Sequence, residues 1–313
     1  VKIANFRSFF NAQKLDFYKT NISAIYGSNA SGKSNTARAL AFAKWFITNS
    51  AKAEIVKIPF EPFLLRADNT LPTTMEIEFN SNNRVFRYGF SFNADEITNE
   101  SLVELTSQKE KIVFVRNSQG IDNIATAKKF GFTENLLSKT RKTTLLITKA
   151  REDNNDYANA VFNFLLHFDV ITCGTPELRQ ICVGLFNRDQ DMKKKILKFL
   201  RNADFWIRDI KVDEIDTPDE IMKNLPFTED FKKNFQKSTS ITTTHSVRDD
   251  NAKIVGSAQF FLDGQESAGT SVAFDLSALI IHSLEKKSAL YIDEFGLHLH
   301  PDICRYIINQ FKN

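Results

Sequence analysis

The sequence has few of the residues and patterns that mark several common classes of protein. Its 313 residues include three cysteines, and no two of them have C-x-x-C spacing. The 41 basic and 38 acidic residues nearly balance, so a net charge of +3 gives no global attraction to nucleic acid or to an anionic membrane. The longest weakly charged stretch, "SVAFDLSALIIHSL", is interrupted by Asp275 and His282 and is too short to span a bilayer. We therefore expect a soluble, cytoplasmic protein with reduced thiols at Cys173, Cys182 and Cys304.

The chain also lacks internal repeats, low-complexity tracts and a targeting signal. Its first ten residues, "VKIANFRSFF", contain Lys2 and Arg7 and have no small-residue cleavage site. Apolar residues make up 42% of the sequence, which is enough for a substantial core. The composition therefore predicts one large folded domain or two, and any charged binding surface must be a local patch.

One short stretch carries a specific chemical pattern. Residues 27–34, "GSNASGKS", fit G-x-x-x-x-G-K-[ST] without a mismatch. The glycines of this pattern let successive backbone N–H groups point at a β-phosphate, and the positive end of the following helix adds to the attraction. Lys33 should reach the β- and γ-phosphate oxygens, and Ser34 should place its hydroxyl on Mg²⁺. The predicted ATP-binding residues are Gly27, Ser28, Asn29, Ala30, Ser31, Gly32, Lys33, Ser34 and Asn35.

The sequence on both sides of this loop supports the interpretation. Residues 21–26, "NISAIY", form a short apolar run that predicts a buried strand. Residues 34–49 predict a helix with one buried face, made by Ala37, Leu40, Ala41, Lys44 and Trp45. The alternative is a surface loop rich in glycine, serine and asparagine. Because both flanks fit, we expect the chain to bind a nucleoside triphosphate.

A second pattern lies near the end of the sequence. Residues 288–294, "SALYIDE", read as a strand that ends in two carboxylates, which is the Walker B pattern. Asp293 would hold Mg²⁺ through water or Ser34, and Glu294 would orient and deprotonate the attacking water. The alternative is an acidic turn after a core strand. Lys33 and Asp293 are 260 positions apart, so a large segment is inserted between the two halves of the nucleotide fold.

Periodicity divides the rest of the chain. Residues 73–115 alternate in the manner of β-hairpins and predict a β-rich layer. The following region is mostly helical, with amphipathic segments at 156–168 and 188–200 and no sustained heptads. Residues 254–264 read as a strand, and residues 267–287 read as a helix with a wide apolar face. The predicted fold class is therefore α/β.

Basic residues gather on the second amphipathic segment. They could meet a phosphate backbone or an acidic partner, or they could simply form a solvated helix face. The absence of heptads predicts that the whole region folds as a compact helical lobe rather than as a long coiled-coil arm. The basic residues are Lys193, Lys194, Lys195, Lys198 and Arg201.

Several segments, taken in order, resemble one family. They are "NFRSF", "YGSNASGKSN", "RYGFSFNADEITNESL", "ESAGT" and "YIDEFGLHLHP". The set is similar to that of AAA-type ABC ATPases of the SMC/RecF/OLD branch, and within it to the prokaryotic RloA/AbiL kind found in anti-phage systems. This resemblance implies an ABC-type P-loop NTPase fold with a β-rich layer and an inserted, mostly helical lobe. The expected division of the chain is an N-terminal half of the ATPase domain at residues 1–116, the helical insertion at 117–240 and a C-terminal half at 241–313. The C-terminal half is expected to be incomplete at its end.

The resemblance also implies a role for residues 266–270, the ESAGT segment. In this family a signature loop meets the γ-phosphate of ATP bound to the opposite subunit. Ser267 and the backbone of Gly269 would be the donors, at the N-terminus of the next helix. Helix capping by Ser267 is the simpler reading, and the same geometry serves both purposes.

Two other features bear on the site. His298 and His300 would share one face of a strand, but no third ligand lies near them in sequence, so a metal site is not expected. They occupy the D-loop position and should shape a subunit contact, with Pro301 starting the next helix. The resemblance is imperfect, because no Q-loop glutamine stands out and the chain stops before a switch histidine.

These observations lead to one function and several alternatives. We expect a Mg²⁺-dependent ATPase that dimerises around ATP and controls a co-encoded effector, a nuclease or toxin, in anti-phage defence. Nucleic acid is a further candidate partner, and no membrane is expected. The main alternative is the ATPase portion of an OLD-type nuclease with a Toprim domain beyond residue 313. A scaffold that binds ATP without hydrolysis is a weaker alternative because of Glu294, and a transporter subunit is disfavoured.

Overall fold

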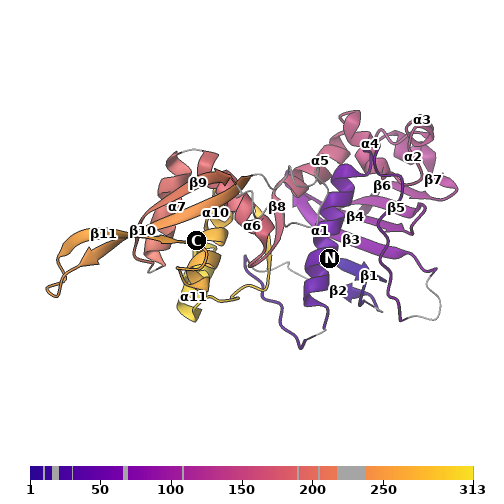
Figure 1. The fold of residues 1–313 in the computed structure, drawn as a ribbon. Helices are drawn as coiled ribbons and strands as arrows, with labels where there is room; N and C mark the ends of the chain where they lie inside the picture. Colours follow the sequence, from indigo (N-terminus) through magenta and orange to yellow (C-terminus); the bar gives the residue numbers. More distant parts are fainter. Residues whose placement is uncertain are drawn as a thin grey trace. The chain divides into compact units, whose positions relative to one another are not determined.

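The computed structural model describes the chain in two compact units (Figure 1). Unit 1 comprises Val1–Ile171 and Lys287–Asp293, and unit 2 comprises Thr172–Lys286 and Glu294–Asn313. Their bounds differ from those of the three segments expected from the sequence, and that division stays a prediction. The described residues are 1–9, 11–15, 21–29, 31–65, 70–107, 109–188, 190–203, 205–216 and 237–312. Ala30, one of the predicted phosphate-binding residues, lies outside them.

Unit 1 is built on an antiparallel sheet of seven strands in the order β2-β1-β3-β4-β5-β6-β7. Side chains of β3 alternate between buried and half-buried, as expected of a strand with one face on a core. Asn82 and Asn83 both have positive φ, the conformation of a tight hairpin turn between β3 and β4. The hairpins predicted for residues 73–115 are confirmed. The strands are β1 (Lys2–Ala4), β2 (Gln13–Lys14), β3 (Thr73–Ser81), β4 (Arg84–Phe92), β5 (Ile97–Leu105), β6 (Glu110–Asn117) and β7 (Gly120–Asp122).

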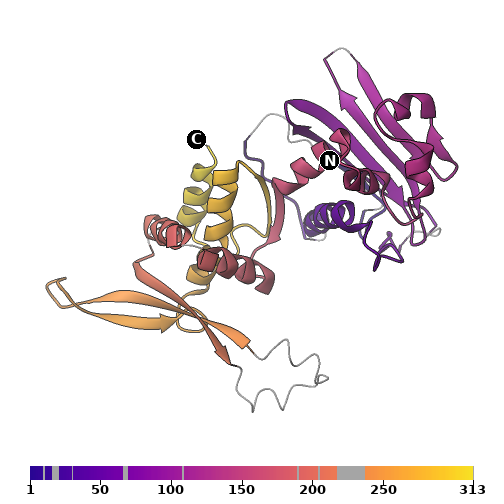
Figure 2. The same cartoon turned by 90° about the horizontal axis from the view of Figure 1, so that it is seen from above.

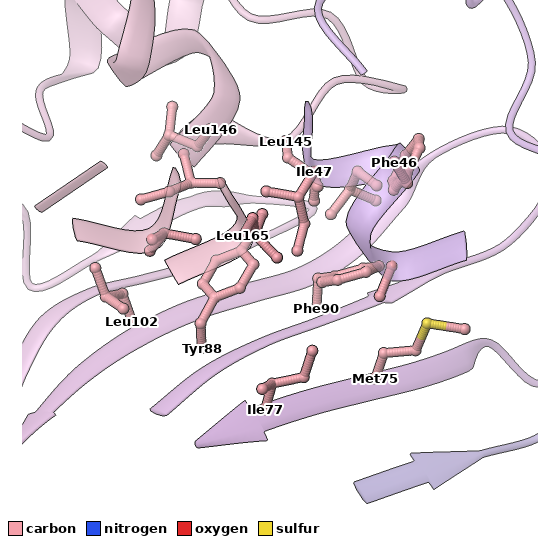
Figure 3. Packing of buried hydrophobic residues seen from close by; sticks show 14 of the residues in the cluster. Phe46, Ile47, Met75, Ile77, Tyr88, Phe90, Leu102, Leu145, Leu146 and Leu165 are labelled. Atoms are coloured by element: carbon pink, nitrogen blue, oxygen red, sulfur yellow. The ribbon is translucent and has the colours of Figure 1, made fainter. Parts of the chain in front are cut away.

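Helices cover one face of this sheet and form the core with it (Figure 3). Tyr88 and Phe90 of β4 lie against Phe46 and Ile47 of the first helix, and all four are almost fully buried. The predicted helix after the glycine-rich loop is confirmed, but its expected buried face is offset, because Trp45 is 39% exposed. The helices are α1 (Lys33–Asn49), α2 (Ile124–Lys128), α3 (Glu134–Ser138), α4 (Leu146–Glu152) and α5 (Asp156–Leu166).

A buried carboxylate joins the sheet to α4. Glu100 on β5 accepts hydrogen bonds from the backbone N–H groups of Leu146 and Ile147, at 2.7 and 2.9 Å. It also faces Arg116 and the hydroxyl of Tyr88. Since α4 has no side-chain cap of its own, Glu100 supplies the negative charge that its N-terminus favours.

Two strands outside the large sheet pair with each other. They are β8 (Phe168–Thr172) and β12 (Ala289–Asp293), and β12 also contacts α1. The strand predicted at residues 21–26 is wrong, because these residues form no ladder and Tyr26 is 90% exposed. An apolar run becomes a strand only where another strand offers its backbone, and β12 pairs instead with β8.

Unit 2 combines helices with a three-stranded antiparallel sheet. Helix α10 packs on α6 and α7, and α7 also contacts β9. The hairpin of β10 and β11 extends away from these helices (Figure 2). The amphipathic segment predicted at 188–200 spans the end of α6 and most of α7, on either side of residue 189. The elements are α6 (Pro176–Arg188), α7 (Gln190–Asn202), β9 (Ile207–Asp216), β10 (Lys237–Arg248), β11 (Ile254–Phe261), α10 (Ala268–Lys286) and α11 (Pro301–Gln310).

Three smaller features of the described residues bear on expectations from the sequence. All three cysteines are free, and Cys173 and Cys182 are buried. Helix α11 begins at Pro301, as expected. None of the helices in the described part of the chain combines the length and apolar content that crossing a membrane requires.

Candidate functional site

The glycine-rich loop of unit 1 is closed by its own lysine. The ammonium of Lys33 donates to the backbone carbonyl oxygens of Gly27 and Ser28, at 2.7 and 2.8 Å. Both hydrogen bonds are exposed to solvent, so the ammonium is free to exchange these carbonyls for phosphate oxygens. A side chain at Gly27 would collide with the hydroxyl of Ser31, at 2.6 Å from the added Cβ. The loop thus brings the first and seventh positions of the motif together.

The second glycine of the motif has two constraints. Gly32 has φ +94°, and an added Cβ would lie 2.4 Å from the ring of Phe9. The ring of Phe9 is almost fully buried and packs directly against Gly32. Beside it, the amide of Asn35 donates to the hydroxyl of Ser8 at 2.6 Å. Phe9 and Ser8 thus help to hold the loop, although the sequence pattern identifies neither of them.

The buried carboxylate expected near this loop is Asp293. It ends β12, which packs against α1, the helix that begins at Lys33. Its side chain is only 8% exposed, and within the described residues it makes no ion pair. Burial, and then the charge of Asp293, raise the pKa of Tyr291 on the same strand to about 12. A buried, unpaired carboxylate is costly unless a cation meets it.

Ser34 and Asp293 fit the donor set of Mg²⁺. Mg²⁺ prefers a carboxylate and a hydroxyl, with waters and phosphate oxygens completing its shell. Ser34 stands in the first turn of α1, and its hydroxyl forms no hydrogen bond with any described residue. Bound there, the ion would neutralise charge on the β- and γ-phosphates.

In unit 2, the ESAGT segment opens α10. The hydroxyl of Ser267 accepts a hydrogen bond from the backbone N–H of Thr270 at 3.0 Å, so the expected cap is confirmed. Ser267 remains exposed. A Cβ on Gly269 would lie 2.8 Å from the carbonyl oxygen of His298. The ESAGT segment therefore lies directly against the "LHLHP" segment.

The residues after β12 form a turn rather than a strand. Glu294, Gly296 and His298 all have positive φ, and the N–H of Leu297 donates to the carbonyl of Glu294 at 3.0 Å. His298 and His300 therefore do not lie on one face of a strand. His300 instead caps α11, where its ring accepts from the N–H of Asp302 at 3.3 Å. Among the described residues, no group of three or more His, Cys, Asp or Glu side chains is arranged to hold a metal.

One arginine that the motifs do not point to holds α10 in place. Arg179 on α6 pairs with Asp275 on α10 and, at 3.0 Å, with Asp263 in the turn after β11. Burial raises the pKa of Asp275, while Arg179 opposes that shift. The sequence signals this ion pair only through Asp275, an aspartate inside an apolar helix, because Arg179 lies 96 residues away.

The basic face of α7 is partly neutralised. Lys193 pairs with Asp209 at 3.0 Å, and Lys195 pairs with Asp191 and Glu285. Arg201 donates to backbone carbonyls near the start of β9. These contacts favour the solvated-face interpretation over a free phosphate-binding surface.

The predicted site residues fall into two groups. The phosphate-binding loop and Asp293 belong to unit 1, whereas Ser267, Gly269 and Glu294 belong to unit 2. No curated protein matches the chain. Residues 22–167 match a family described as "AAA domain, putative AbiEii toxin, Type IV TA system". This span begins just before the glycine-rich loop and ends with α5, so it omits Asp293 and all of unit 2. Residues 22–167 are therefore similar to the AAA domain of a P-loop ATPase family, and this similarity supports a nucleoside triphosphate as the ligand of the glycine-rich loop.

Proposed function

We propose that the protein is a Mg²⁺-dependent ATP hydrolase whose subunits close as a pair around ATP, and that this closure controls an effector in prokaryotic anti-phage defence. One observation supports the proposal: the candidate residues for ATP binding and hydrolysis divide between the two units. Unit 1 has a phosphate-binding loop beside a buried carboxylate, and unit 2 has an exposed serine at the start of a 19-residue helix. Each half-site by itself offers only part of what ATP hydrolysis needs.

The residues have distinct tasks in this proposal. Lys33 leaves the carbonyls of Gly27 and Ser28 and takes up the phosphate oxygens. Ser34 and Asp293 hold the metal ion. Glu294 is exposed and follows Asp293 directly, so it accepts the proton of the attacking water.

The second half-site acts on an ATP molecule held by another subunit. The N-terminus of α10 carries a partial positive charge, which attracts an anion. Ser267 and the first backbone N–H groups of that helix would contact the γ-phosphate. Gly269 lets the helix start approach the segment after Glu294. ATP would therefore join two copies of the chain, and hydrolysis would release them.

The family description supports one kind of effector. The matched family is named for a toxin and a type IV toxin–antitoxin system. This supports a co-encoded nuclease or toxin as the protein whose activity the ATP-dependent pair controls. The ion pairs of Lys193 and Lys195 give less support to direct nucleic-acid binding.

A mixing experiment tests the proposal. Lys33→Ala should abolish ATP binding, and Ser267→Arg should preserve it but block the γ-phosphate of the neighbouring subunit. Neither protein should hydrolyse ATP alone. A mixed pair contains one site with an intact loop and an intact Ser267, so mixing should restore part of the phosphate release.

The control is Ser257→Arg, which adds the same charge at an exposed serine of β11 and should hydrolyse ATP normally. In the Glu294→Gln background, light scattering should show an ATP-dependent dimer that Ser267→Arg removes. A normal dimer of the Ser267→Arg protein would refute the proposed pairing.

A further inference from the structure

Hydrogen bonds to the largely buried carboxylate of Glu266 connect the ESAGT segment to the β10–β11 hairpin. One oxygen of Glu266 accepts hydrogen bonds from the hydroxyl of Thr243 and, at 2.6 Å, from Nε2 of His245. The Glu266 side chain is 12% exposed, and Thr243 is fully buried. Because a carboxylate oxygen only accepts, His245 must carry its hydrogen on Nε2. The contact therefore requires a specific donor at each position.

The strand geometry explains why two donors converge on one oxygen. Thr243 and His245 are two positions apart on β10, so their side chains lie on the same face. Thr244, between them, points to the opposite face. The ring of His245 stands edge-on to Phe260 of β11, with ring centres 5.5 Å apart. The histidine is thus held between the second strand of the hairpin and Glu266.

The backbone of the connecting turn is fixed as well. The N–H groups of Gln265 and Glu266 both donate to the carbonyl of Phe261, the last residue of β11. On the other side of Glu266, the N–H of Ser271 donates to the carbonyl of Ser267 at 3.1 Å. Glu266 therefore lies between the end of the hairpin and the first turn of α10. A displacement of its side chain would displace Ser267, the next residue in the chain.

We propose that Glu266, held by Thr243 and His245, is a positioning residue that sets the place of Ser267 for its contact with the ATP of a neighbouring subunit. This inference rests on the proposed function and deepens it. It makes the β10–β11 hairpin a regulator of subunit pairing, because movement of the hairpin is transmitted through these two hydrogen bonds. Glu266 itself touches neither ATP nor water in this scheme.

The test uses a matched pair of substitutions on β10 in the full-length Glu294→Gln chain. Thr243→Val removes one donor and keeps the side-chain shape, and Thr244→Val makes the same change on the opposite face. Thr243→Val and His245→Ala should weaken the ATP-dependent dimer about tenfold, since losing one partner of a charge-assisted hydrogen bond costs on that order. Thr244→Val should dimerise like the parent.

Two further measurements separate positioning from simple loss of structure. Binding of a labelled ATP analogue to the single subunit should not change in any of these variants, because the phosphate-binding loop belongs to unit 1. His245→Gln, whose amide N–H can replace Nε2, should restore most of the dimer affinity.

The outcomes distinguish this inference from the function on which it rests. If Ser267→Arg disrupts the dimer but Thr243→Val and His245→Ala do not, only the positioning role is overturned. It is also overturned if His245→Gln dimerises as weakly as His245→Ala, because the donor then does not matter. If the parent itself forms no ATP-dependent dimer, the proposed function fails and this inference fails with it.

Discussion

Gly269 illustrates how much a single residue can require. Gly269 is the second residue of α10, and alanine is normally preferred to glycine at a helical position. Yet an added Cβ would lie 2.8 Å from the carbonyl oxygen of His298, and a backbone atom cannot rotate away. The glycine is therefore needed for close approach rather than for its conformational freedom.

A comparison of two glycines tests this argument. Gly269→Ala should destabilise the protein by about 1–3 kcal/mol, the usual cost of overpacking. Gly184→Ala, on the exposed face of α6 with open space around it, should stabilise it by about 0.5–1 kcal/mol. Denaturant unfolding measures both changes. Effects of the same sign and size would show that Gly269 is not held against His298.

The sequence predicts some residues of the candidate site and misses others. The motif identifies Lys33 and Ser34 because their spacing alone determines their place in the loop. It does not identify Phe9, whose contact with Gly32 depends on the turn after β1, where Phe9 forms an isolated bridge with Phe6. The same holds for His245 and Glu266, which lie 21 residues apart and meet only through the hairpin.

At the scale of elements, a carboxylate connects three strands of the large sheet. Glu104 on β5 accepts from Nε of Arg84 on β4 at 2.7 Å, and from Lys111 on β6 at 3.1 Å. Arg84, followed by Lys111, lowers the pKa of Glu104 from 4.5 to about 2. The folded state therefore releases the Glu104 proton more readily than the unfolded chain does.

This shift predicts a pH dependence of stability. The contribution of Glu104 is fully present above pH 4.5 and is lost as the pH falls from 4.5 towards 2. Glu104→Gln should cost about 1–2 kcal/mol at pH 7, because solvent screens the partly exposed Arg84 and Lys111, and nothing near pH 2. Urea unfolding from pH 2 to 7 measures the difference. If the free energy of unfolding of Glu104→Gln differed from that of the parent by the same amount at every pH, the assignment would be contradicted.

Elements were predicted well where local pattern decides them. Helices α1 and α10 and the hairpins of the large sheet follow from apolar periodicity and turn residues. The prediction of a strand at 21–26 was wrong, because a strand needs a neighbouring strand to pair with and periodicity does not reveal that neighbour. The alternation of "LHLH" likewise does not produce a strand, because Glu294, Gly296 and His298 have positive φ angles.

At the scale of the whole molecule, the two tryptophans report separately on the two units. Trp45 belongs to unit 1 and Trp206 to unit 2, and both are partly exposed. Trp206→Phe therefore leaves fluorescence that follows unit 1 alone, and Trp45→Phe leaves fluorescence that follows unit 2. The three segments expected from the sequence also separate Trp45 (residues 1–116) from Trp206 (residues 117–240), although their bounds differ from those of the two units.

These reporters test where ATP binds. In the Glu294→Gln background, ATP at about 100 times its Kd should stabilise the unit that binds it by about 2.7 kcal/mol. At protein concentrations too low for pairing, the unfolding midpoint seen by Trp45 should rise, and that seen by Trp206 should rise less. Lys33→Ala should abolish both shifts. A larger shift at Trp206 would place the main nucleotide contact in unit 2 and contradict the assignment to unit 1.

The division of unit 1 along the chain has a consequence for biosynthesis. The large sheet and its helices are complete by residue 171, but β12 with Asp293 follows only after residues 172–286. At about 5–20 residues per second, the ribosome adds that stretch in roughly 6–23 seconds. During this interval a nascent chain has its phosphate-binding loop without the acidic strand. If the proposed function holds, the growing protein would therefore hold nucleotide weakly until β12 has been synthesised.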